Sequence, residues 1–92
     1  MQLIDFKSMV SEQNLVDIIL FLVRKENGFG YPQMDRFFSR HKFSVIENGE
    51  FMRTFEQMRL KGEVELREKM LVVKGPNWKE PRFVTDKKYG IE

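Results

Sequence analysis

The sequence predicts a single α+β domain in which three main helices precede a C-terminal β-hairpin or three-stranded sheet. Two observations support this prediction. The apolar run Leu15–Val23, broken by one aspartate, is typical of a helix in the core. Further along, Phe51, Phe55 and Met58 repeat at helical spacing, and the residues after Gly62 alternate polar and apolar. A helix therefore gives way to a half-buried strand within one short stretch of chain.

Composition favours one folded domain with an ordinary soluble surface. Of the 92 residues, 41% are hydrophobic and 33% are charged, which is enough for a single modest core. The chain contains no cysteine, which excludes a disulfide scaffold and thiolate chemistry. Its apolar run is about half the roughly 20 residues that a membrane span needs. No signal-peptide pattern is present, so we expect no membrane association and a cytoplasmic protein, or a nuclear one in a eukaryotic host.

The first main helix is expected between residues 11 and 26. Ser11 is a suitable N-cap, and the residues that follow leave almost no polar face. Such a helix is either the central core helix or partly buried by a second subunit, and we favour the core helix. Residues 1–10 show no clear period. They could form a short helix, a strand packed on the body or a dimer arm.

A break is predicted at Asn27–Gly30, because asparagine and glycine adopt positive φ easily. The second helix is expected after this break. Pro32 suits the first turn of that helix, where its missing N–H is not needed. Met34, Phe37 and Phe38 then give the apolar stripe. The next segment, residues 41–50, is predicted to be either an enlarged turn or a short strand at residues 43–46.

The third helix contains Phe51, Phe55 and Met58 and stops at Gly62, which can adopt the left-handed conformation. Lys61 lies in its last turn, where a cation complements the helix dipole. Candidate strands follow this helix at Glu63–Arg67, Met70–Lys74 and Arg82–Thr85. Residues 86–92 are predicted to be a polar tail, with room for one helical turn.

The pattern Phe55-x-x-Met58-x-x-x-Gly62-x-Val64 resembles the end of the third helix and the first wing strand of winged helix-turn-helix domains. The resemblance covers most of the chain and implies one winged-helix-like domain with a basic hairpin after the third helix. The exposed wing is either the short connection at 67–69 or the loop at 75–81, and we favour the longer loop slightly. The join at residues 41–50 is longer than the turn usual in this family.

No catalytic or metal-binding pattern is evident in the sequence. His41 is the only histidine, and with no cysteine beside it a zinc site is not specified. The serines lack the G-x-S-x-G context of a hydrolase, and the Gly28-Phe29-Gly30 stretch lacks the third glycine of a dinucleotide fingerprint. We therefore expect a protein that is not an enzyme and needs no cofactor or metal.

DNA binding is the leading functional prediction. Residues 51–92 carry ten basic and seven acidic groups, against six basic and seven acidic in residues 1–50. The resemblance implies that the third helix enters the major groove, where Arg53 can pair with guanine and Gln57 with adenine. Basic residues downstream would neutralise phosphates. The predicted DNA-binding residues are Arg53, Thr54, Gln57, Lys61, Lys69, Lys74, Trp78, Lys79 and Arg82. The partner would be double-stranded DNA. We expect a homodimer, joined by the first helix or by residues 1–10.

A protein-binding module, such as a small inhibitor or immunity-type protein, is the alternative prediction. Glu47, Glu50 and Glu56 share the third helix region and would repel DNA. Trp78, in a Gly/Pro-rich loop, could anchor a protein partner, wedge into a minor groove, or fold back as a lid over the core. Met52 falls beside Phe51 and off the apolar stripe, and an exposed methionine next to Phe29 or Tyr31 would mark a partner surface. DNA binding needs one continuous basic face, whereas a protein inhibitor would present mixed charges.

Overall fold

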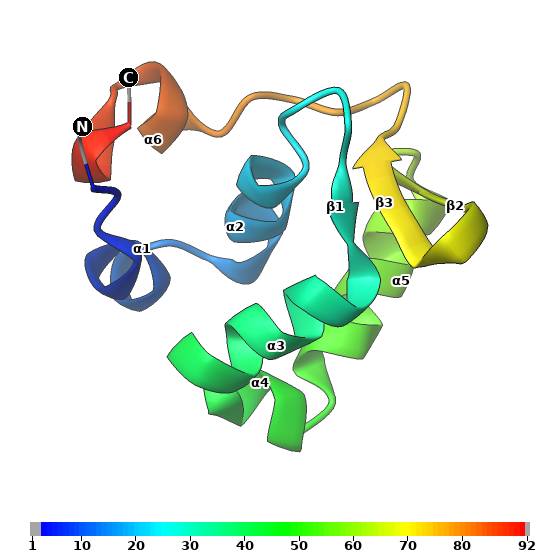
Figure 1. Ribbon diagram of the computed structural model, residues 1–92, viewed down its shortest axis with the longest axis horizontal. Helices are drawn as coiled ribbons and strands as arrows, with labels where there is room; N and C mark the ends of the chain where they lie inside the picture. The colour runs from blue at the N-terminus through cyan, green and yellow to red at the C-terminus, as the bar shows by residue number, and fades with distance from the viewer. Residues whose placement is uncertain (1–2, 92) are drawn as a thin grey trace.

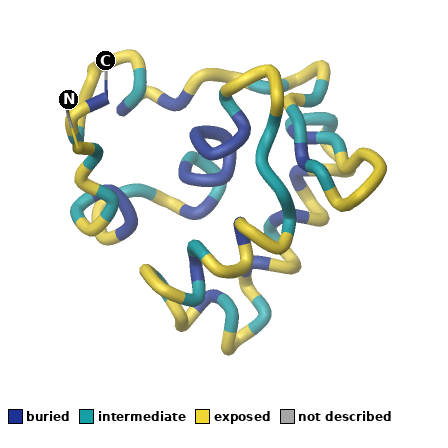
Figure 2. Tube along the Cα trace, viewed as in Figure 1, coloured by how far each residue is buried: buried dark blue, intermediate teal, exposed yellow. Residues whose placement is uncertain are grey.

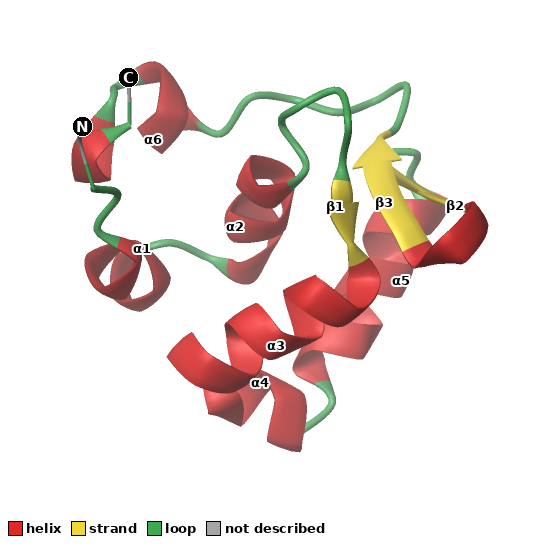
Figure 3. Cartoon of the chain, viewed as in Figure 1, coloured by secondary structure: helices red, strands yellow, loops and turns green. Residues whose placement is uncertain are grey.

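The computed structural model describes residues 3–91, which form six α-helices and a three-stranded antiparallel sheet (Figure 1). The α+β class predicted from the sequence is confirmed, with more helices than the three expected. The helices are α1 (Phe6–Glu12), α2 (Leu15–Leu22), α3 (Tyr31–His41), α4 (Phe43–Glu47), α5 (Glu50–Leu60) and α6 (Arg82–Thr85). The strands are β1 (Phe29–Gly30), β2 (Val64–Arg67) and β3 (Leu71–Lys74), in the sheet order β1-β3-β2. Figure 3 shows the strands together on one side of the molecule and α6 on the opposite side.

The predicted first helix is two helices, so the single span from residue 11 was wrong. Ser11 lies inside α1, whose N-cap is Asp5. α2 begins only after Asn14, whose side-chain oxygen accepts a 2.8 Å hydrogen bond from the backbone N–H of Asp17. Gln13 and Asn14 both have extended backbone, which breaks the helical path between them. Asn14 therefore acts as a helix start, because its short amide competes with the helix that would otherwise continue.

α2 is the central core helix, as predicted. Its apolar side chains are buried on nearly all sides, and Figure 2 shows most of the helix as buried. The Phe21 ring lies 6.4 Å from the Phe6 ring of α1 and 5.7 Å from the Phe83 ring of α6. Met9 and Val10 of α1 are buried in the same cluster. The chain itself covers α2 and one face of α1, while Leu3 of the predicted arm is 85% exposed. The homodimer stays a prediction.

The segment between α3 and α5 is a short helix, so both predicted alternatives for residues 41–50 were wrong. α4 buries Val45 and packs against both α3 and α5, while Phe43 stays 56% exposed. A short apolar run of this kind does not distinguish strand from helix by its period alone. Gly49, with φ of 79°, turns the chain from α4 into α5. The second and third predicted helices correspond to α3 and α5, which end at His41 and Leu60.

The sheet contains two of the three strands predicted after the third helix, and a further strand where a break was predicted. β2 pairs with β3, with Leu66 opposite Val72, and Phe29 of β1 lies opposite Val72 on the other side. The strands β2 and β3 are joined by a tight turn at Glu68–Met70. The loop at 75–81, slightly favoured as the wing, follows β3 and joins it to α6 instead of connecting two strands (Figure 1).

The C-terminal segment differs from its prediction in two ways. Residues 82–85 form α6 and not a strand, with Pro81 fixed at φ of −59° just before the helix. Residues 86–91 are in part packed, because Ile91 is buried and the Tyr89 ring lies 5.6 Å from Phe83. Residue 92 of the predicted tail lies outside the described residues, as do residues 1 and 2 of the predicted arm. The backbone N–H of Asp5 donates to the carbonyl of Tyr89 at 2.8 Å, so both ends of the described chain meet.

Candidate functional site

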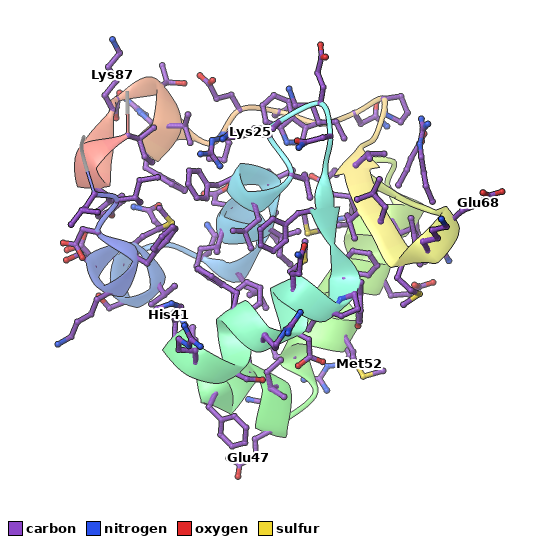
Figure 4. The ribbon with its side chains drawn as sticks, viewed as in Figure 1. Lys25, His41, Glu47, Met52, Glu68 and Lys87 are labelled. Atoms are coloured by element: carbon purple, nitrogen blue, oxygen red, sulfur yellow. The ribbon has the colours of Figure 1, made fainter. Side chains whose placement is uncertain are left out.

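α5 turns an exposed stripe of side chains to solvent. Its inner face carries Phe51, Phe55 and Met58, all buried, with the Phe51 ring tilted against Tyr31 of α3 and the Phe55 ring edge-on to it. The opposite face, at spacings of three and four residues, carries Arg53, Glu56, Gln57 and Leu60. Leu60 is 73% exposed and Met52, which projects from the same helix in Figure 4, is 67% exposed. We refer to Met52, Arg53, Glu56, Gln57 and Leu60 as the α5 surface.

The charges on and beside α5 cancel. Residues 47–61 contain three acidic and three basic side chains: Glu47, Glu50, Glu56, Arg53, Arg59 and Lys61. Arg59 donates two hydrogen bonds to the carboxylate of Glu56, one of them from Nε at 3.0 Å. This pairing lowers the pKa of Glu56 below its ordinary value of 4.5, because the bonds favour the charged carboxylate. The helix therefore presents paired and mixed charges instead of a positive stripe.

The two predicted base-reading residues lie one turn apart on this surface. Arg53 and Gln57 are both exposed, whereas Thr54 is half-buried. The guanidinium of Arg53 donates from Nη1 to the carbonyl of Asn48 at 3.1 Å, which links α5 to the end of α4. Arg53 therefore has a structural contact, although most of its donors still face solvent.

The loop at 75–81 folds back onto the body. The indole Nε1 of Trp78 donates to the carbonyl of Leu20 in α2 at 2.9 Å, and the Nζ of Lys74 lies 4.1 Å from the Trp78 ring centroid. Asn77 donates from Nδ2 to the carbonyl of Lys61 at 2.8 Å, which fixes the loop against the end of α5. Trp78 is half-buried against the core cluster, as the lid alternative describes. An indole held in this way is not free to insert into a groove.

The structure brings some of the predicted site residues together and separates others. Lys61, Trp78 and Lys79 line one hollow of about 440 Å³, whose wall also includes Glu63. Lys69 lies apart at the turn of the hairpin, next to Glu68, which is labelled in Figure 4. Arg82 begins α6 on the opposite side of the molecule, where its Nε lies 3.9 Å from a carboxylate oxygen of Asp86 (Figure 3). The nine residues do not form one continuous face.

Sequence reasoning missed two features. Leu60 was not singled out, although its spacing from Phe51, Phe55 and Met58 already excludes it from the buried stripe. A second hollow on α3 was also missed, and its signal in the sequence is Arg36 and Arg40 four residues apart on a helix.

Residues 3–91 contain neither a cluster of potential metal ligands nor a helix that could span a membrane. No group of three or more histidine or acidic side chains in this part of the chain is arranged to hold a metal ion. None of the helices in the same residues has the length and apolar character needed to cross a bilayer. Comparisons with protein-family models, with curated proteins and with solved structures found no match.

Proposed function

We propose that this chain is a winged-helix-like binding module that is not an enzyme, and that α5 is its contact helix. The order of the elements supports the winged-helix-like assignment. α2, α3 and α5 supply three helices, and the β2–β3 hairpin follows the third, which is the order that the sequence resemblance implies. The extra helix α4 is a departure from that pattern. Among these elements, α5 has the most exposed large apolar side chains, Leu60 at 73% and Met52 at 67%.

The partner we propose is a protein, and the exposure of Leu60 and Met52 on a helix of balanced charge is the observation that supports it. Protein interfaces have an apolar centre and a polar rim, and exposed Leu and Met side chains among polar ones can supply such a centre. DNA affinity instead depends on cations that neutralise phosphates, and residues 47–61 carry no net positive charge. A small inhibitor or immunity-type protein that covers a site on its partner would present such a surface.

DNA remains a second candidate because of one specific observation. Arg53 and Gln57 are exposed one turn apart on α5, the spacing at which two side chains can reach neighbouring bases. Lys61 and Lys79 lie close together beyond the end of the same helix. These groups are fewer than the nine first predicted, since Arg82 lies elsewhere and Trp78 is held against α2.

The first experiment distinguishes the two partners. A fluorescently labelled duplex of random sequence is titrated with the protein, and anisotropy is measured at about 50 and 200 mM salt. The protein-binding proposal expects no binding at micromolar protein at either salt. Binding that weakens about a thousandfold between these salts would contradict it and favour DNA. In that case Arg53→Ala combined with Gln57→Ala should reduce discrimination between sequences.

The second experiment tests the α5 surface directly. A photo-crosslinking amino acid replaces Leu60 in one variant and Leu3, which is 85% exposed, in another. A protein captured from position 60 but not from position 3 is purified, and its affinity is measured by calorimetry. Leu60→Asp should weaken that affinity at least about tenfold, because a central apolar contact is replaced by a buried charge. Leu3→Asp is the matched control and should bind as the parent does. Equal affinity for all three proteins would exclude α5 as the contact helix.

A further inference from the structure

A second concave site lies on α3, away from the α5 surface. Its lining residues come from β1 and α3: Phe29, Gln33, Arg36, Phe37, Arg40 and His41. The hollow has a volume of about 330 Å³, which is at the small end of ligand-sized sites. His41, labelled in Figure 4, lies at the end of α3 next to α1. We call these six residues the α3 hollow.

The polar groups of the α3 hollow are almost all hydrogen-bond donors. Within residues 3–91, the guanidinium groups of Arg36 and Arg40 have no hydrogen-bond or ion-pair partner. The Oε1 of Gln33 already accepts the backbone N–H of Gly30 at 3.0 Å, which leaves its amide NH₂ as the free group. No carboxylate lines the hollow. The hollow is thus complementary to a negatively charged ligand and offers little to a cation.

The carboxylate nearest in sequence does not neutralise these arginines. Asp35 accepts a hydrogen bond from the hydroxyl of Ser39 at 3.2 Å, along a stripe of α3 adjacent to the one that carries Arg36 and Arg40. Two arginines four residues apart on a helix have neighbouring side chains, so both can reach one anionic group. Guanidinium groups bind phosphate and carboxylate oxygens in pairs of parallel hydrogen bonds.

The apolar part of the hollow is a fixed aromatic wall. The ring of Phe37 packs edge-on against Phe38 at 5.3 Å and against Phe6 at 5.4 Å between centroids, and it lies 4.7 Å from the His41 ring. Phe29 of β1 contributes a second half-buried ring to the lining. A wall held by three aromatic neighbours can contact a flat apolar ligand without reorganising.

We propose that the α3 hollow binds an organic phosphate, specifically a phosphate monoester on an aromatic or similarly flat apolar group. Arg36 and Arg40 bind the phosphate oxygens, the amide NH₂ of Gln33 adds a donor, and Phe37 and Phe29 contact the apolar part. This assignment is independent of the proposed protein partner, because it uses residues of α3 and β1 and none of the α5 surface.

The test is an NMR titration. Phenyl phosphate is added to the isotope-labelled protein, and the chemical shifts of the backbone amides are measured at each step. Inorganic phosphate and phenol are titrated separately as the two halves of the ligand. We expect saturable shifts confined to residues 29–41, with phenyl phosphate binding more tightly than either half. Arg36→Gln and Arg40→Gln should each weaken binding about tenfold, because a charged hydrogen-bond donor is lost. Both side chains are exposed, so these variants keep the fold, and unchanged core resonances would verify this.

Arg67→Gln is the matched control, since Arg67 is an exposed arginine on β2 outside the hollow. It should bind phenyl phosphate as the parent does. Three results would overturn the proposal: no saturable shift at millimolar phenyl phosphate, equal weakening by Arg67→Gln, or equal affinity for inorganic phosphate and phenyl phosphate. The last result would mean that the aromatic wall takes no part in binding.

Discussion

The indole Nε1 of Trp78 donates a hydrogen bond of 2.9 Å to the carbonyl oxygen of Leu20, one of the last carbonyls of α2. The final carbonyls of a helix lack partners within the helix, and a buried one needs a donor from elsewhere. Here the backbone N–H of Arg24 bonds to Phe21, so the indole supplies the partner that Leu20 lacks. The loop at 75–81 therefore completes the end of the core helix.

Replacing Trp78 by phenylalanine should destabilise the protein by at least about 0.5–1.5 kcal/mol, because the Leu20 carbonyl loses its donor and the smaller phenyl ring loses part of the indole's packing against the core. Urea unfolding followed by far-UV circular dichroism measures this difference. Lys74→Met is the control, since it removes the cation above the ring and leaves the N–H bond in place. A Trp78→Phe protein as stable as the parent would show that water or another group serves Leu20 equally well.

Gly28→Ala should be more destabilising than Gly49→Ala, although both glycines have positive φ. A Cβ at position 28 would lie 2.4 Å from the Val72 carbonyl oxygen, a backbone atom of the central strand. At position 49 the nearest atom is the end of the flexible Arg53 side chain, at 3.1 Å. We expect roughly 1 kcal/mol for the positive φ at either site and a further loss only at position 28. Equal urea unfolding midpoints for the two variants would contradict the close approach of Gly28 to the Val72 carbonyl of β3.

Phe38→Ala should cost about 3–5 kcal/mol, because Phe38 is fully buried and packs against Phe51 at 5.1 Å between ring centroids. Phe43→Ala makes the same chemical change at a position that is 56% exposed, and should cost less than about 1 kcal/mol. Chemical unfolding of the two variants beside the parent gives the comparison. Similar losses of stability for both variants would contradict the exposed position of Phe43 on α4.

The stability that Asp5 contributes to α1 should disappear in acid. Hydrogen bonds from the Ser8 hydroxyl and backbone N–H hold the pKa of this capping carboxyl below its ordinary value of 3.8. A lowered pKa in the folded state means that the contribution is complete above 3.8 and is lost as the pH falls through the folded value. Asn caps helices equally well and does not titrate.

The measurement for this prediction is the unfolding free energy of the parent and of Asp5→Asn across the acid range. The parent should lose stability more steeply than the variant below the ordinary aspartate pKa. The other carboxylates are common to both proteins and cancel in the difference. If the difference in unfolding free energy between the two proteins stays constant with pH, protonation of Asp5 does not affect stability.

Local patterns predicted those elements whose signals are contained in a few neighbouring residues. The stripe of Phe51, Phe55 and Met58 ends at Gly62, and α5 and β2 follow this pattern closely. The α1–α2 boundary was missed because Ser11 and Asn14 are both competent caps and only the fold selects between them. The two-residue strand β1 has no signal of its own, since it exists through pairing with β3 far along the chain.

Tertiary contacts also explain the errors at the C-terminus and the partial success at the candidate site. Residues 82–85 have strand-forming side chains, yet they form α6 because Phe83 packs between Phe21 and Tyr89. The exposure of Arg53 and Gln57 followed from helical spacing alone. The α3 hollow could not be predicted in this way, because its wall requires Phe29 of one element to lie beside Phe37 of another.

The contact between Asp5 and Tyr89 has a consequence for synthesis of the chain on the ribosome. Their backbone hydrogen bond joins residues near opposite ends of the sequence, and the Tyr89 hydroxyl also donates to Glu12 at 2.7 Å. α1 leaves the ribosome before Tyr89 does, so it can complete these contacts only after the segment that contains Tyr89 has also emerged. The helix must therefore wait for Tyr89, and a nascent chain stalled before residue 89 would carry α1 without this partner.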